Sequence, residues 1–251
     1  MSLLAQVTTT KQWDLGESEL PPVRMNIQGT DGIGKSTFGA AAPSPIFIQA
    51  EDGLNFINVA RFPVAQTWQE ILDQLKTLVQ EDHTYRTLVL DTTDAACTKS
   101  EAHACEKNGW ESIDSPGFGK GYTFVGELWV HLLQGLNVLY EQKRMNIILL
   151  SHVESKIHND PLTESYDRYA MRCAKKVNAL IKDWVDFNLF ANYQTQVQKD
   201  GNKNRAVSYG NRALYTKFAA GYDAKSRVGL PDKLDFTWDA FAESYAAALN
   251  N

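Results

Sequence analysis

Eight consecutive residues near the start of the chain have the types and the spacing of a phosphate-binding loop. Residues 29–36 read Gly-Thr-Asp-Gly-Ile-Gly-Lys-Ser and follow directly on a short apolar stretch. Glycines let successive backbone N–H groups turn toward a phosphate, the amine of Lys35 reaches the β and γ phosphates, and the hydroxyl of Ser36 can bind Mg²⁺. The pattern predicts a nucleotide site formed by Gly29, Thr30, Asp31, Gly32, Ile33, Gly34, Lys35, Ser36 and Thr37.

The context of this loop decides between a nucleotide site and an ordinary glycine-rich turn. Residues 23–28 form an apolar run that precedes it, and the sequence after it permits a helix that begins at Lys35. A helix N-terminus placed there adds its partial positive charge to the anion site. We therefore favour nucleotide binding over a turn without a ligand.

Two carboxylates stand at the ends of later apolar runs. Leu-Val-Leu precedes Asp91, and Ile-Phe-Ile-Gln-Ala precedes Glu51. In α/β sheets the carboxyl ends of parallel strands face the ligand, and Mg²⁺ requires oxygen ligands. We predict that Asp91 and Ser36 hold Mg²⁺ and that Glu51 is the general base that activates water. Asp52 is an alternative to Glu51, and a solvent-facing turn residue is the alternative for each acid.

His152 follows a third apolar run, Asn-Ile-Ile-Leu-Leu-Ser. A polar side chain at such a strand tip can contact the γ phosphate and respond to its loss, which makes His152 a candidate for a catalytic or sensing role. A structural histidine with satisfied hydrogen bonds is the alternative interpretation.

The spacing of apolar residues predicts that these side chains sit on a mostly parallel sheet flanked by helices, an α/β fold with right-handed crossovers. Residues 153–169 lose this periodicity, and we expect a loop there. The last strands are expected to extend one edge of the sheet in antiparallel fashion, with a hairpin turn at 199–202. Expected strands lie at 23–28, 46–50, 87–91, 146–150, 186–197 and 206–217, and helices at 67–80, 93–107, 124–140, 173–185 and 238–249.

Length and composition fit one large domain with appendages. The chain has 251 residues and 43% hydrophobic residues, enough for a substantial single core. We expect an irregular segment at 1–20, the core domain at 21–237 and a C-terminal helix at 238–251. The formal net charge is −5, so no overall positive field attracts nucleic acid, and any contact with DNA requires a local patch.

Cysteine content and hydropathy bear on location. The cysteines are Cys97, Cys105 and Cys173, an odd number without a C-x-x-C pair, which suits a reducing cytoplasm better than a disulfide framework. The first residues are too poor in apolar side chains for a signal peptide, and no stretch approaches 18 apolar residues. We expect a soluble cytoplasmic protein without membrane contact.

Taken together, the loop, residues 47–54, 88–91 and 148–152 resemble the RecA-like ATPase core. More closely, they resemble phage-encoded nucleotide-binding proteins of that superfamily, which include single-strand annealing recombinases of the Sak type. Residues 224–231, Ala-Lys-Ser-Arg-Val-Gly-Leu-Pro, are similar to a stretch in those proteins. The resemblance implies ATP and Mg²⁺ as cofactors, a homo-oligomeric ring or filament, a bacterial host cytoplasm, and Glu51 and His152 as the catalytic glutamate and the γ-phosphate switch.

The same resemblance directs attention to basic residues. Loops after the strands that end at 91 and 150 correspond to the DNA-binding loops of recombinases. The candidate contacts to single-stranded DNA are Lys156, Arg168, Arg172, Lys175 and Lys176, although acids are mixed into residues 153–169. A solvated helix face is the alternative for these lysines and arginines. Cations that reach a neighbouring subunit's phosphates are a further implication, with Arg212, Lys225 and Arg227 as candidates.

Three functions remain compatible with the sequence. The first is a RecA-like, Mg²⁺-dependent ATPase that acts on single-stranded DNA in phage recombination or annealing. The second is a nucleotide-dependent binding or loader module for a replication or recombination protein, with little DNA affinity of its own. The third is a small-molecule kinase, which shares the phosphate loop but also needs a cationic lid.

Overall fold

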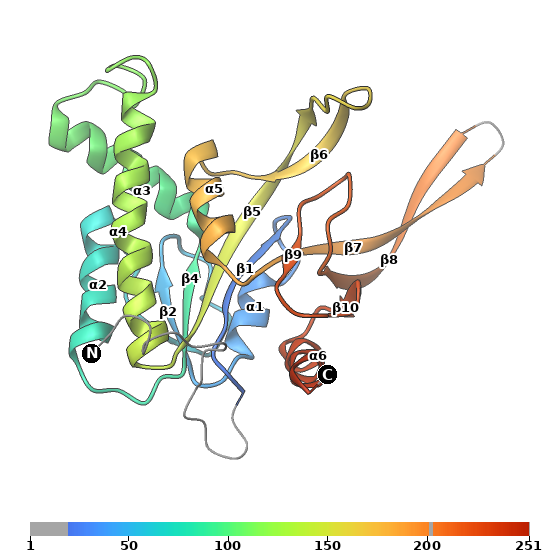
Figure 1. Cartoon of the computed structure of the whole chain (residues 1–251), viewed down its shortest axis with the longest axis horizontal. Coiled ribbons are helices and arrows are strands. Elements are labelled where there is room, and N and C mark those ends of the chain that lie inside the picture. The colour runs from blue at the N-terminus through green and yellow to red at the C-terminus, as the bar shows by residue number, and fades with distance from the viewer. Residues whose placement is uncertain (1–19, 201–202, 251) are drawn as a thin grey trace, which may run out of the picture.

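The computed structural model describes residues 20–200 and 203–250, so residues 1–19 of the expected irregular segment at 1–20 and part of the expected turn at 199–202 lie outside them. In the described residues, ten strands belong to one sheet in the order β10-β8-β7-β1-β5-β4-β2-β3, with β6 paired to β5 and β9 paired to β7 (Figure 1). The strands are β1 (Arg24–Gly29), β2 (Pro45–Gln49), β3 (Ala60–Arg61), β4 (Thr87–Asp91), β5 (Asn146–His158), β6 (Tyr166–Met171), β7 (Phe187–Asp200), β8 (Lys203–Tyr215), β9 (Lys225–Ser226) and β10 (Lys233–Asp235).

Helices cover both faces of this sheet. One face carries α2, α3, α4 and α5, which pack on Ile48, Leu90 and Leu149, and the other carries α1 and α6, which pack on Ile27 and Leu150 (Figure 1). Strand residues that alternate between two buried faces explain why the central strands read as continuous apolar runs. The helices are α1 (Lys35–Ala40), α2 (Trp68–Gln80), α3 (Thr93–Asn108), α4 (Lys120–Gln142), α5 (Lys175–Trp184) and α6 (Trp238–Leu249).

The predicted α/β fold class is confirmed. Strands β7, β1, β5, β4, β2 and β3 are mutually parallel, and β8 and β10 continue the β7 edge in antiparallel pairing. This pairing places the carboxyl ends of β1, β5, β4 and β2 side by side at one edge of the sheet. Residues far apart in the sequence therefore meet there.

The expectation of a loop at 153–169 is wrong. Strand β5 continues to His158, and the chain returns as β6 in antiparallel pairing from Val153–Met171 to His158–Tyr166. Figure 1 shows this hairpin extending past the carboxyl ends of the other parallel strands, to one side of α4 and α5. Because most of its side chains are half-buried or exposed, the hairpin lacks the alternation of apolar and polar residues by which a one-sided strand is recognised.

No helix in the described part of the chain has both the length and the apolar content to cross a membrane.

Candidate functional site

The predicted phosphate loop connects β1 to α1 at the carboxyl edge of the sheet. Gly32 and Gly34 have positive φ angles of 70° and 104°, which glycine adopts without strain. Gly29 needs its missing side chain for another reason, since a Cβ there would lie 2.6 Å from the carbonyl oxygen of Ala191 on β7. The local backbone therefore explains why glycine occupies these three positions of the motif.

Lys35 lies across the loop. Its side chain is buried, and Nζ donates to the carbonyl oxygens of Gly29 and Thr30 at 3.0 and 2.9 Å. Burial lowers the pKa of Lys35 to about 8, although the carboxylates of Asp31 and Asp91 act in the opposite direction. An ammonium held in this way is positioned to meet an anion that enters the loop.

Ser36 and Asp91 are in direct contact, as the predicted Mg²⁺ pair requires. The Ser36 hydroxyl donates to Oδ2 of Asp91 at 2.7 Å, and Asp91 ends β4 with only 4% of its surface exposed. Burial raises the pKa of Asp91, while the hydrogen bond from Ser36 opposes the shift. Two oxygen donors from the loop and a neighbouring strand fit a hard cation such as Mg²⁺.

Glu51 lies near the same edge, just past the end of β2. Ligand atoms of Glu51, Asp94 and His152 all lie within 4.8 Å of one another. The structure thus brings Glu51 and His152 together, as their positions at strand ends predict. Their catalytic roles stay predictions.

Asp94 is a site residue that the sequence analysis missed. It lies in the first turn of α3, where its two oxygens contact the Nδ1 and the backbone N–H of His152 at 3.0 and 3.1 Å. Burial acts to raise the pKa of Asp94, but its hydrogen bonds with His152 outweigh burial and lower the pKa to about 2. A carboxylate three residues after Asp91 reads as an ordinary first-turn acid, so only the fold identifies its partner.

We expect Asp94→Asn to destabilise the protein at pH 7 by about 2 kcal/mol, from the lowering of the Asp94 pKa. A carboxyl group with a lowered pKa in the folded protein stabilises it above the unfolded pKa of 3.8, and this stabilisation is lost as the pH falls toward 2. Urea unfolding of wild type and variant at pH 7 and pH 3 measures the difference, which should shrink at pH 3. An equal difference at both pH values would contradict the prediction. Asp73→Asn, on an exposed part of α2, is the matched control.

Arg172, a candidate DNA contact, faces the phosphate loop. Its Nη2 lies 2.9 Å from Oδ2 of Asp31, whose other oxygen lies 3.1 Å from Nε2 of His152. Arg172 directly follows β6, and its backbone N–H donates to the His152 carbonyl at 3.1 Å. The hairpin of β5 and β6 is thereby connected to the phosphate loop through charged side chains.

The other candidate DNA contacts are spread over the hairpin and the start of α5. Arg168 lies 3.7 Å from Asp223, and its guanidinium stacks 4.8 Å above the Phe218 ring. Lys156 pairs with Glu154 at 2.8 Å. A cavity of about 620 Å³ beside α5 is lined in part by Lys156, Lys175, Lys176 and Tyr122.

The candidate cations for a neighbouring subunit fall into two places. Arg212 on β8 donates from Nη1 to the Ile33 carbonyl of its own phosphate loop at 2.9 Å. Lys225 donates to the carbonyl of Lys182, and Arg227 lies 3.5 Å from Asp186 beside the amino end of β7, away from the loop edge. Neither Lys225 nor Arg227 reaches the phosphate loop of its own chain, and a role toward another subunit stays a prediction. The side chains at 195–209 are outside the described residues.

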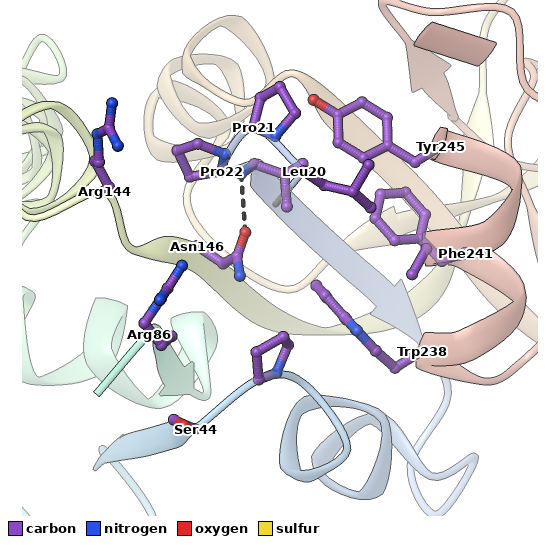
Figure 2. Close-up of a pocket in the computed structure, with 13 residues that line it drawn as sticks. Leu20, Pro21, Pro22, Ser44, Arg86, Arg144, Asn146, Trp238, Phe241 and Tyr245 are labelled. Atoms are coloured by element: carbon purple, nitrogen blue, oxygen red, sulfur yellow. Dashed lines mark hydrogen bonds between the residues drawn. The ribbon is translucent and has the colours of Figure 1, made fainter. Parts of the chain in front are cut away.

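A separate cavity of about 430 Å³ lies at the opposite edge of the sheet (Figure 2). Asn146 at the start of β5 accepts from the backbone N–H of Val23 at 3.1 Å, and Trp238, Phe241 and Tyr245 of α6 form its apolar wall. Because this edge carries the amino ends of the strands, the cavity is distinct from the site formed by the loop and Asp91.

Comparison with known proteins gives two findings. Residues 21–228 match a family described as AAA domain. Over 134 residues, the chain is also 23% identical in sequence to the SPbeta prophage-derived uncharacterized protein YorG of Bacillus subtilis (strain 168). That similarity covers 51% of this chain and 40% of the relative.

Proposed function

This chain belongs to the AAA domain family of P-loop nucleotide-binding domains, and on that basis we propose that it is a Mg²⁺-dependent ATPase that oligomerises and acts on single-stranded DNA in phage recombination or annealing. The observation that carries the proposal is the contact of Ser36 with Asp91 beside a lysine that spans the phosphate loop. This combination supplies groups for phosphates and for a cation at one edge of the sheet.

Each side chain of the site has a distinct role in the proposed hydrolysis of ATP. Ser36 and Asp91 would hold Mg²⁺, which when bound neutralises charge on the phosphate oxygens. Lys35 binds the β and γ phosphates, and Glu51 orients the attacking water and accepts its proton. His152, aligned by Asp94, contacts the terminal phosphate and senses its loss.

Action on DNA is supported by less direct observations. The relative is named as prophage-derived, and Lys175 and Lys176 are exposed at the start of α5. Arg168 and Arg172, in contrast, are already in ion pairs with acids. This pairing favours the second candidate function, a nucleotide-dependent loader or binding module for a replication or recombination protein.

Titration of the protein into fluorescently labelled single-stranded DNA, with and without ATP and Mg²⁺, distinguishes the DNA-binding ATPase from the loader module. We expect ATP to raise the DNA affinity, and the affinity to fall as salt rises because phosphate contacts release counterions. Replacing Lys175 and Lys176 by alanine together should weaken binding and reduce the salt dependence, whereas the exposed Lys76→Ala on α2 should not. ATP hydrolysis with no DNA binding at low salt would favour the loader.

A further inference from the structure

Asp31 of the phosphate loop carries two ionic contacts at once. Its Oδ1 lies 3.1 Å from Nε2 of His152, and its Oδ2 lies 2.9 Å from Nη2 of Arg172. The Asp31 side chain is 60% exposed, so no packing fixes it there. Asp31 is a loop residue, and among the carboxylates near Lys35 it acts most strongly to raise the pKa of that ammonium.

His152 and the backbone of Arg172 are held in place by contacts that do not involve Asp31. Asp94 binds both the ring and the backbone of His152, and the backbone N–H of Arg172 donates to the His152 carbonyl. The register of β1 and β5 sets Gly29 opposite His152, beside the start of the loop. His152 and the backbone of Arg172 are therefore fixed side by side there, whereas the exposed side chains of Asp31 and Arg172 can exchange partners.

A terminal phosphate matches these partners better than a carboxylate does. The arginine fork binds phosphate oxygens in pairs, and the higher charge of a phosphate attracts both donors while it repels Asp31. An exposed ion pair contributes little free energy, so the exchange of partners costs little. A diphosphate lacks the outermost phosphate and leaves the Asp31 contacts intact.

We infer that Asp31 is a built-in competitor of the γ phosphate for His152 and Arg172, and that it sets the discrimination of the site between ATP and ADP. The inference rests on the proposed function of the same site. Binding of ATP transfers Arg172 from Asp31 to the terminal phosphate. Since Arg172 directly follows β6, this transfer links the β5–β6 hairpin to the identity of the bound nucleotide.

Calorimetric titration of the full chain with ATP and with ADP, both with Mg²⁺, tests this assignment. We expect Asp31→Asn to bind ATP about fivefold more tightly, the value of one exposed ion pair, while its ADP affinity changes less than about twofold. Arg172→Met should weaken ATP binding selectively. In the Arg172→Met background, Asp31→Asn should increase the ATP affinity by a smaller factor than it does in the wild type, because one contact of Asp31 is already absent.

Glu154→Gln is the matched control, because it removes a negative charge that acts on Arg172 without a direct contact to it. It should change the affinities for ATP and ADP by equal small factors. Equal tightening of both nucleotides in Asp31→Asn, or no change in their ratio, would overturn the inference alone. If the wild-type protein bound neither nucleotide, the proposed function would fail and the inference with it.

Discussion

Lys35→Ala should abolish ATP turnover and weaken nucleotide binding by about 30- to 1,000-fold, the cost of removing one partner from a buried charged contact. Lys35 is the buried ammonium at the loop, and its burial is tolerated because the carbonyls of Gly29 and Thr30 accept its hydrogen bonds. Alanine would remove the charge that phosphates require at that point. Binding is measured by titration calorimetry and turnover by phosphate release.

A control variant and a folding measurement show whether the effect of Lys35→Ala is specific to the nucleotide site. Lys76→Ala on the exposed side of α2 removes the same charge from a distant place and should leave turnover unchanged. Circular dichroism melts of Lys35→Ala show whether the loss reflects unfolding, because the variant removes the hydrogen bonds that Lys35 donates to the Gly29 and Thr30 carbonyls. A folded Lys35→Ala variant with wild-type ATP turnover would contradict the assignment of residues 29–37 as the nucleotide site.

The charge around Lys35 explains why a cation should accompany the nucleotide. Four carboxylates, those of Asp31, Asp91, Glu51 and Asp94, act on Lys35, whereas Arg172 and Arg212 are the arginines that contact the loop. A free triphosphate would meet more negative than positive charge at this edge, and like charges at such distances repel. Neutralisation by Mg²⁺ between Ser36 and Asp91 would remove much of that repulsion.

The sequence predicts best where a motif and a strand end coincide. Ser36 and Asp91 are 55 residues apart, yet the loop pattern and the apolar run before Asp91 are sufficient to predict that they meet. Glu51 and His152 follow from the same rule, because the sheet order sets β2, β4, β5 and β1 side by side.

Residues that lie neither in a motif nor at a strand end cannot be predicted in this way. Asp94 reaches a partner 58 residues away from inside a helix, where the sequence shows only an acid in a first turn. Arg212 contacts Ile33 across 179 residues because β7 pairs with β1 and β8 with β7, which apolar spacing does not specify. The sequence of the β5–β6 hairpin predicts a loop because most of its side chains are half-buried or exposed and show no alternating apolar pattern. Long-range pairing, not local pattern, determines all three.

Glu51→Gln should lower the turnover number for ATP by about 100- to 10,000-fold, the usual contribution of a positioned general base. Its ATP affinity should stay within about threefold of the wild type, since a base contributes chiefly in the transition state. Glu51 is half-buried beside His152 and near Asp91, at the edge where the phosphates would lie. Single-turnover phosphate release and equilibrium ATP binding separate these two effects.

The neighbouring acids decide whether Glu51 is the base. Asp52→Asn removes an exposed carboxylate that contacts Asn55, and it should leave turnover near the wild-type value. Asp94→Asn should lower both stability and turnover, because it releases His152. Only a base gives a large loss of turnover with unchanged affinity and unchanged stability. If Asp52→Asn showed that combination and Glu51→Gln did not, the base would be Asp52, the alternative that the sequence itself leaves open.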